Sequence, residues 1–160
     1  MSEKIYIDTC ALNRIADDQS QPRVRQEAEA MVGILDLVAA GRLIWSASTV
    51  LHFEVQRTPD PIRRMGTLKL LSNATETVSP TLKTLQRASD LALSGLAYLD
   101  ALHFATAEQQ DADSFITTDD RLLKQVRARL QITRPEVVNP VEWIERRLPW
   151  LLPKAPSSAT

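Results

Sequence analysis

Short apolar segments that alternate with longer amphipathic ones constrain the fold of this chain more than any other feature of its sequence. The apolar segments, which read as strands, cover residues 4–9, 43–47, 76–78, 114–118 and 137–138. Strands that are apolar throughout are typical of a parallel sheet buried on both faces. The alternation predicts a single α/β domain in which a mainly parallel sheet of about five strands carries helices on both faces.

Two of the predicted helices have clear sequence signatures. The helix over residues 22–40 has apolar positions at helical spacing, namely Val24, Ala28, Met31, Leu35 and Val38. The acids Glu27, Glu29 and Asp36 lie off that line, and Gly41 follows the helix as a C′ residue. A later helix is expected to open at Ser79-Pro80, with the serine as N-cap and the proline as first helical residue. The other helices are expected over residues 48–57, 62–71, 96–109, 121–130 and 141–147.

Length and composition exclude several classes of protein. The 160 residues favour one domain, which we expect to span residues 1–148, followed by a Pro- and Ser-rich tail at 149–160. A net charge of −1 argues against a basic nucleic-acid-binding tail. One cysteine excludes a Cys-cluster site and two histidines leave little room for a His-rich one, so a bound metal would be Mg²⁺ or Mn²⁺ held by oxygen. No apolar run approaches the ~20 residues of a membrane span and no signal peptide is evident, so we expect a cytoplasmic protein without membrane contact.

Four acidic residues fall where this fold would bring them together. Asp8 follows the first predicted strand and Asp119 follows the fourth, and the carboxyl ends of parallel strands meet at one sheet edge. Glu54 lies in the helix after the second strand, and Asp100 lies in the most apolar helix, where an unpaired carboxylate is costly to bury. Carboxylates held close together repel one another, and a divalent cation reverses that effect. Water activated by such an ion can attack a phosphodiester.

Each acid also has a purely structural interpretation. Asp8 could cap the segment after it, and Asp119 or Asp120 could cap the next helix. Asp100 could complement the dipole of its helix, and Glu54 could be a solvated helix residue. Taken singly, Asp8 and Asp100 favour function, whereas Glu54 and Asp120 favour structure. The joint pattern of four acids is more specific than any one of them.

Four segments, in this order, carry a recognisable set of motifs: Ile5–Leu12, Ser48–Glu54, Leu99–Ala107 and Phe115–Leu122. With them the sequence resembles the PIN-domain family over roughly residues 3–146, the extent of one domain. Within that family it resembles the VapC-like toxins of bacterial and archaeal toxin–antitoxin pairs. The resemblance implies a Mg²⁺- or Mn²⁺-dependent endoribonuclease in which water is the nucleophile and the products carry a 5′-phosphate and a 3′-hydroxyl.

The resemblance also assigns roles to residues and implies partners. The catalytic acids would be Asp8, Glu54, Asp100 and Asp119. The metal ligands would be Asp8, Asp100 and Asp119. Residues that contact substrate or support the metal ligands would be Thr9, Thr117, Asp120 and Arg121. Asp120 is the alternative to Asp119 as fourth acid, and the implied partners are RNA, a cognate antitoxin and a second copy of the chain.

Further residues near these acids have weaker interpretations. Candidate phosphate contacts form two groups, Arg14, Arg121, Lys124 and Arg127, and then Arg57, Arg63, Arg64 and Lys69. His103 lies one turn from Asp100, and we expect a core residue, with a contact to the acids as the secondary interpretation. Cys10, beside Asp8, reads as a small buried residue rather than a nucleophile. Trp45, Trp143 and Trp150 could belong to the core or to a dimer interface.

Other proteins with an acid after the first strand fit this sequence less well. A haloacid-dehalogenase-type phosphatase needs a second acid two residues after the first, where this chain has Cys10. A phospho-receiver domain needs a lysine after the fifth strand, and residues 137–145 contain none. The remaining alternative is a PIN fold that has lost catalysis and serves as an RNA-binding or scaffold protein.

Overall fold

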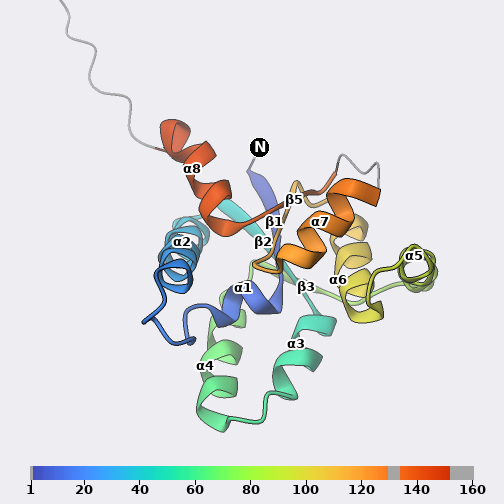
Figure 1. The fold of residues 1–160 in the computed structure, drawn as a ribbon, viewed down its shortest axis with the longest axis horizontal. Helices are drawn as coiled ribbons and strands as arrows, with labels where there is room; N and C mark the ends of the chain where they lie inside the picture. The colour runs from blue at the N-terminus through green and yellow to red at the C-terminus, as the bar shows by residue number, and fades with distance from the viewer. Residues whose placement is uncertain (1, 130–133, 152–160) are drawn as a thin grey trace, which may run out of the picture.

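A five-stranded parallel sheet runs through the centre of the protein, as the alternation of strands and helices predicts (Figure 1). The structure is a computed structural model and describes residues 2–129 and 134–151. The strands are β1 (Glu3–Ile7), β2 (Leu43–Ser48), β3 (Glu76–Val78), β4 (Ser114–Ile116) and β5 (Glu136–Val138). Their order across the sheet is β3-β2-β1-β4-β5, and every neighbouring pair is parallel.

The direction in which successive strands are placed across the sheet reverses between β1 and β4. From β1 the chain moves outward through β2 and β3, then crosses to β4 and β5 on the other side. Ile5 pairs with Trp45 of β2 and with Ser114 of β4, so β1 lies in the middle of the sheet. In open α/β sheets, ligands bind outside the carboxyl ends of the strands at such a reversal. The topology therefore directs attention to the residues that follow β1 and β4.

Helices cover both faces of the sheet. They are α1 (Thr9–Asn13), α2 (Pro22–Ala39), α3 (Thr49–Gln56), α4 (Pro61–Leu71), α5 (Leu82–Leu93), α6 (Tyr98–Gln109), α7 (Asp120–Arg129) and α8 (Pro140–Leu151). Helices α2 and α8 pack together on one face, while α5, α6 and α7 lie on the other (Figure 1). Helices α1, α3 and α4 gather below the carboxyl ends of the strands. In the described ranges, no helix has the length and apolar character needed to cross a membrane.

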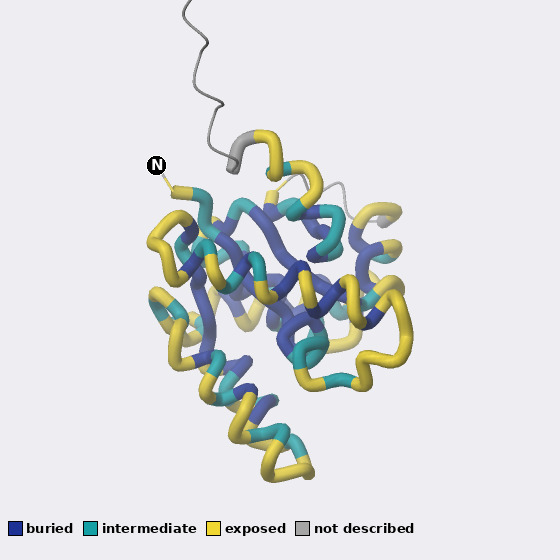
Figure 2. The backbone as a smooth tube through the Cα atoms, turned by 90° about the vertical axis from the view of Figure 1, so that its left-hand side faces the viewer, coloured by how far each residue is buried: buried dark blue, intermediate teal, exposed yellow. Residues whose placement is uncertain are grey.

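Aromatic side chains lock β1 to β4 inside the core, where Figure 2 shows buried backbone through the middle of the molecule. The Tyr6 and Phe115 rings stack with their centroids 5.4 Å apart, and Phe104 packs against Phe115 at 5.6 Å. Trp45 and Trp143 are fully buried, so both belong to the core. The third tryptophan, at position 150, has a side chain outside the described residues. Because β1 and β4 share this packing, the residues that follow them start from fixed positions.

Three local expectations differ from the structure. Helix α5 begins at Leu82 rather than Pro80, because Thr81 and Thr84 form a capping box there. The short helix α1 was not predicted, since five residues carry no readable periodicity. Helix α8 continues to Leu151, so the tail predicted from residue 149 begins inside a helix, and its remainder at 152–160 lies outside the described residues.

Glu27 of α2 is buried, with 1% of its surface exposed, although it lies off the apolar line of its helix. The Nε atoms of Arg14 and Arg23 lie 3.3 and 3.2 Å from its Oε1. The Asn139 amide donates to its Oε2 at 2.7 Å. Apolar periodicity misplaced this residue because ion pairs and a hydrogen bond, rather than apolar contacts, satisfy it inside the protein.

Candidate active site

Asp8 is held by hydrogen bonds where β1 ends. It is the N-cap of α1, and its Oδ1 accepts from the Thr9 backbone N–H at 2.9 Å. Its Oδ2 accepts from the Thr117 hydroxyl at 2.9 Å and from the Cys10 thiol at 3.3 Å. Its backbone N–H donates to the Ile116 carbonyl of β4 at 2.9 Å. The capping role and a role in a site are therefore compatible, because capping fixes a buried carboxylate at the centre of the sheet edge.

Asp119 lies on the neighbouring strand end and is tied to Asp8 through one hydroxyl. Its Oδ1 accepts from the backbone N–H groups of Arg121 and Leu122, at 2.9 and 3.1 Å, and so caps α7. Its own N–H donates to the Thr117 hydroxyl at 3.1 Å, and that hydroxyl donates to Asp8. The fully buried Thr117 thus sets the positions of two of the four acids relative to each other.

Asp120 faces a different environment from Asp119. Arg23 donates to both of its carboxylate oxygens, at 2.7 and 2.8 Å, and both side chains are more than half exposed. The hydrogen bonds from Arg23 lower the pKa of Asp120. This pair lies on the surface, so the geometry favours Asp119 over Asp120 as the fourth acid.

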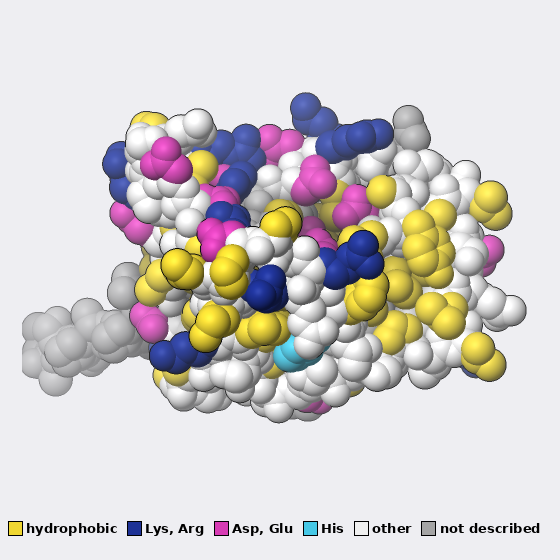
Figure 3. All heavy atoms as spheres, turned by 90° about the horizontal axis from the view of Figure 1, so that it is seen from below, with side chains coloured by type: hydrophobic (Ala, Val, Ile, Leu, Met, Phe, Trp, Pro, Cys, Tyr) yellow, Lys and Arg dark blue, Asp and Glu magenta, His cyan; other side chains and the backbone are white. Residues whose placement is uncertain are grey.

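The pKa of Asp100 responds to the charges of the other three acids. It lies in the first turn of α6 and is half-buried. Burial, followed by the negative charges of Asp8 and Asp119, raises the pKa of Asp100 to about 6. Glu54 adds to the rise and His103 opposes it. Four carboxyl groups from distant parts of the sequence therefore share one electrostatic environment, and Figure 3 shows acidic side chains in the middle of this face.

A small cavity of about 80 Å³ opens between Asp100 and Asp119, and Arg121 and Gln125 also line it. Water occupies about 30 Å³ per molecule in the liquid, so the space suits a few waters or a partly hydrated ion rather than an organic cofactor. Arg121 reaches the site by its place in the first turn of α7. No side-chain hydrogen bond or ion pair occupies Arg121 within the described residues.

Glu54 enters the site from α3 and contacts a histidine. Its Oε2 lies 2.5 Å from Nε2 of His103, one turn after Asp100. Burial alone would lower the pKa of His103, but the hydrogen bond to Glu54 and the charge of Asp8 raise it. The three-residue spacing from Asp100 made a contact of His103 with the acids a secondary interpretation, but nothing in the sequence indicated Glu54, 49 positions earlier, as the partner.

Cys10 and Thr9 lie beside Asp8 and differ in their chemistry. Burial and the charge of Asp8 raise the pKa of the Cys10 thiol to about 12, so it stays protonated and is a poor nucleophile at neutral pH. Thr9 supports Asp8 through its backbone N–H. Its buried hydroxyl has no hydrogen-bond partner among the described residues.

Most of the predicted phosphate-binding cations are engaged elsewhere. Arg63 pairs with Asp17, Arg64 donates to the Thr58 carbonyl, and Arg57 lies over the Phe53 ring. Arg14 pairs with Asp17 and Glu27, and Arg127 with Glu142. Within the described part of the chain, Arg121, Lys124 and Lys69 make no side-chain hydrogen bond or salt bridge, although the charge of Lys124 acts on Asp120. Of these, Arg121 and Lys124 share one face of α7 beside Asp119.

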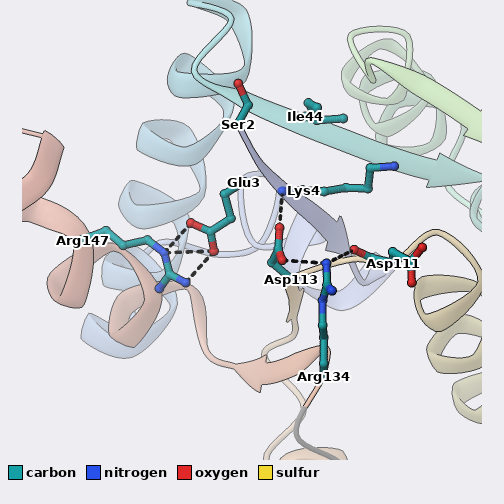
Figure 4. Close-up of a pocket in the computed structure, with 8 residues that line it drawn as sticks. All are labelled: Ser2, Glu3, Lys4, Ile44, Asp111, Asp113, Arg134 and Arg147. Atoms are coloured by element: carbon teal, nitrogen blue, oxygen red, sulfur yellow. Dashed lines mark hydrogen bonds and ion pairs between the residues drawn. The ribbon is translucent and has the colours of Figure 1, made fainter.

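A wide hollow at the other end of the sheet carries no such chemistry. It measures about 800 Å³ and lies around the start of β1 (Figure 4). Its charged side chains neutralise one another, since Arg147 pairs with Glu3 and Arg134 pairs with Asp113. It also lies at the amino ends of the strands, away from the edge where ligands bind in this class of fold.

The donor atoms of the acid cluster fit a hard cation. Within residues 2–129 and 134–151, no three His, Cys, Asp or Glu side chains form a ready-made ligand set. Mg²⁺, however, is usually held by one or two carboxylates and keeps several waters. The Asp100 carboxyl, whose pKa is raised by burial and by the charges of the neighbouring acids, accepts no hydrogen bond from the described residues. Asp8, Asp100 and Asp119 therefore suit Mg²⁺ or Mn²⁺ better than a softer metal.

Comparison with known protein families gives a match that covers most of the chain. The model of the PIN domain matches residues 5–128. The chain belongs to the PIN-domain family. PIN domains are commonly nucleases that use divalent metals, and the match extends from β1 to α7, so it contains all four acids. Among curated proteins, none matches the chain.

Proposed function

We propose that this PIN domain is a Mg²⁺- or Mn²⁺-dependent endoribonuclease that hydrolyses RNA phosphodiester bonds. The observation that carries the proposal is the convergence of Asp8, Glu54, Asp100 and Asp119 at the carboxyl edge of β1 and β4. Burial, together with the charges of the other three acids, raises the pKa of Asp100 to about 6. A site that concentrates negative charge around a small polar cavity is suited to a divalent cation.

The chain's own residues divide the work between metal binding and positioning. Asp8, Asp100 and Asp119 would hold the ion, which when bound would neutralise charge on the phosphate and activate water. Thr117 orients Asp8 and Asp119 through its hydroxyl. In Glu54, Oε2 is engaged by His103 and Oε1 accepts no hydrogen bond from the described residues, so Oε1 would orient the attacking water.

The substrate would be held by the two cations of α7 nearest the acids, which make no salt bridge within the described residues. Arg121 lines the cavity between Asp100 and Asp119, and Lys124 lies one turn further along the same helix. Both side chains would contact RNA phosphates on either side of the scissile bond. Such contacts position a nucleic acid without reading its sequence.

We infer from the VapC-like motifs that the enzyme acts in the cytoplasm as the toxin of a toxin–antitoxin pair, with a small antitoxin and a second copy of the chain as partners. An exposed apolar surface supports the second copy. Phe53, Leu99 and Tyr98 line a groove of about 390 Å³. Tyr98 also lines an adjoining groove of about 460 Å³ with Leu82 and Leu85 of α5 (Figure 3). Contiguous apolar surface of this kind marks protein interaction sites.

Removal of the metal is expected to stop RNA cleavage. A labelled structured RNA incubated with the protein and Mg²⁺ or Mn²⁺ should be cut, and EDTA should abolish the cut, because the acids repel phosphate when no cation is present. Asp8→Asn should lose the activity, whereas the exposed Asp36→Asn on α2 should keep it. A protein that cuts no RNA, and whose melting temperature does not rise with either metal, would be the inactive scaffold instead.

Light scattering coupled to size exclusion tests the second copy. The wild-type protein is expected to elute at twice the chain mass, and Tyr98→Lys should shift it to the monomer, because a charge in the centre of an apolar interface remains desolvated and unpaired. The matched variant Gln56→Lys, at an exposed position of α3, should remain dimeric. A monomeric wild type at micromolar concentration contradicts the proposal.

A further inference from the structure

A buried histidine connects the α3 acid to the middle of the sheet, and the proposed chemistry does not yet use it. His103 has 1% of its surface exposed. Its Nε2 lies 2.5 Å from Glu54 Oε2, and its Nδ1 lies 2.7 Å from the Tyr6 hydroxyl. The Tyr6 hydroxyl lies 2.7 Å from Ser48 Oγ. Ser48 is the N-cap of α3, where its Oγ accepts from the Leu51 backbone N–H at 3.1 Å.

These contacts form a closed path. Ser48 fixes the start of the helix that carries Glu54, and the path from Ser48 through Tyr6 and His103 returns to the Glu54 carboxylate. Tyr6 belongs to the central strand β1, two residues before Asp8. The path therefore fixes the Glu54 side chain relative to β1, the strand that also sets the position of Asp8.

All hydrogen bonds of the path can form in both charge states of the imidazole. A carboxylate can only accept, so His103 Nε2 carries a proton and donates to Glu54 in either state. In the imidazolium, Nδ1 donates to the Tyr6 oxygen; in the neutral ring, Nδ1 accepts from the Tyr6 hydroxyl. Burial raises the pKa of Tyr6 well above its usual value, so the phenol keeps its proton and can take either part.

Glu54 needs such a partner because of its surroundings. Its side chain is 31% exposed and the charges around it come from other carboxylates. Repulsion and solvation would both favour rotamers that turn a free carboxylate toward water. Within the described part of the chain, His103 is the one side chain that donates to the Glu54 carboxylate.

We propose that His103 is a positioning residue that acts through Glu54, holding its carboxylate toward Asp8 and Asp100 with the help of Tyr6 and Ser48. This rests on the proposed nuclease function, in which Glu54 orients the attacking water. His103 itself touches neither substrate nor metal ion. Loss of a purely structural core histidine would act on the stability of the fold. Loss of His103 would instead lower the turnover rate, with little effect on RNA binding.

Two amide variants distinguish the role of His103 Nε2 from that of Nδ1. Glutamine places an N–H near the position of Nε2, so His103→Gln keeps a donor for Glu54. Asparagine reaches only the position of Nδ1, so His103→Asn loses that donor. We expect His103→Asn to lower kcat by about 10–100-fold with little change in KM, as for partners that orient catalytic ligands, and His103→Gln to recover most of the rate.

A double-mutant cycle tests whether the effect passes through Glu54. In the Glu54→Gln background, adding His103→Asn should cause no further loss of kcat, because the group that it positions is already gone. The same fractional loss in both backgrounds would overturn the proposal, as would equal rates for the Asn and Gln variants. His52→Asn, at the other histidine of the chain, is the matched control and should keep wild-type kcat.

A proton NMR measurement without RNA keeps this inference separate from the nuclease proposal. With two histidines in the chain, His52→Asn assigns the ring signals. The His103 Nε2 proton should appear far downfield, as expected for a short bond to a carboxylate, and should move upfield in Glu54→Gln. A signal that does not respond to Glu54→Gln overturns the contact whatever the activity. A responsive signal in a protein that cuts no RNA overturns the nuclease, and with it the positioning role.

Discussion

Asp100→Asn is expected to make the metal-free protein more stable at neutral pH while reducing RNA cleavage by at least about 100-fold. The loss of activity should exceed the 10–100-fold typical of residues that merely support a metal ligand, because Asp100 would itself hold the ion. The gain in stability follows from the raised pKa of Asp100, which shows that its negative charge is disfavoured in the folded protein.

The direction of the pKa shift of Asp100 determines how the stability of the protein depends on pH. The pKa of Asp100 is about 6 in the folded state and near 3.8 in an unfolded chain. Between these values the folded state holds the proton more tightly, so stability falls as pH rises through about 6. Asparagine mimics the protonated form at every pH. The melting temperature of Asp100→Asn should therefore exceed that of wild type at pH 7.5, and the difference should shrink below pH 6 and vanish near pH 4.

The size of the gain should be modest, since part of the Asp100 side chain faces solvent, which screens its charge. We expect a few degrees in EDTA, where about 2–4 °C corresponds to 1 kcal/mol for a domain of this size. Added Mg²⁺ should raise the melting temperature of wild type but not of Asp100→Asn, because binding to the folded state alone stabilises it. Asp36→Asn, which removes an exposed acid, should behave as wild type; a drop in the melting temperature of Asp100→Asn at pH 7.5 contradicts the proposed repulsion.

Much of this site could be predicted from the sequence because its parts lie at the ends of regular elements. The apolar runs that form β1 and β4 are short and uninterrupted, so the positions of Asp8 and Asp119 relative to the sheet follow from the strands alone. Parallel topology then brings those two strand ends to one edge. The family match over residues 5–128 agrees with that prediction of the fold.

What sequence could not supply was the set of hydrogen bonds between distant residues. The resemblance selects Asp119 over Asp120 by the spacing from Thr117, but nothing in the local pattern shows that Asp120 pairs with Arg23 of α2. The link from Tyr6 to His103 joins residues 97 positions apart, and apolar periodicity places both simply in the core. Periodicity reports which face of an element is buried and carries no information about which polar groups pair inside.

The pairing of Glu27 is the unpredicted polar contact with the largest expected effect on stability. Its carboxylate is buried beneath two arginines and the Asn139 amide, and these contacts join α1, α2 and the start of α8. Removing one partner of a buried ion pair typically costs about 3–5 kcal/mol, because the remaining charges stay desolvated without compensation. Here Arg14 and Arg23 keep their second partners, Asp17 and Asp120, so the lower end of that range applies.

Glu27→Ala is therefore expected to lower the free energy of unfolding by about 3 kcal/mol, or the melting temperature by about 10 °C. The matched variant is Glu29→Ala, which makes the same change on an exposed position of α2 and should stay within about 0.5 kcal/mol of wild type. Calorimetry or urea unfolding at pH 7 measures both. Similar losses for the two variants would contradict a special role of the buried network, because Glu29 lies outside it and alanine is the stronger helix former. Because Glu27 touches none of the four acids, its variant should still cut RNA well below its melting temperature, which separates the support of the fold from the chemistry of the site.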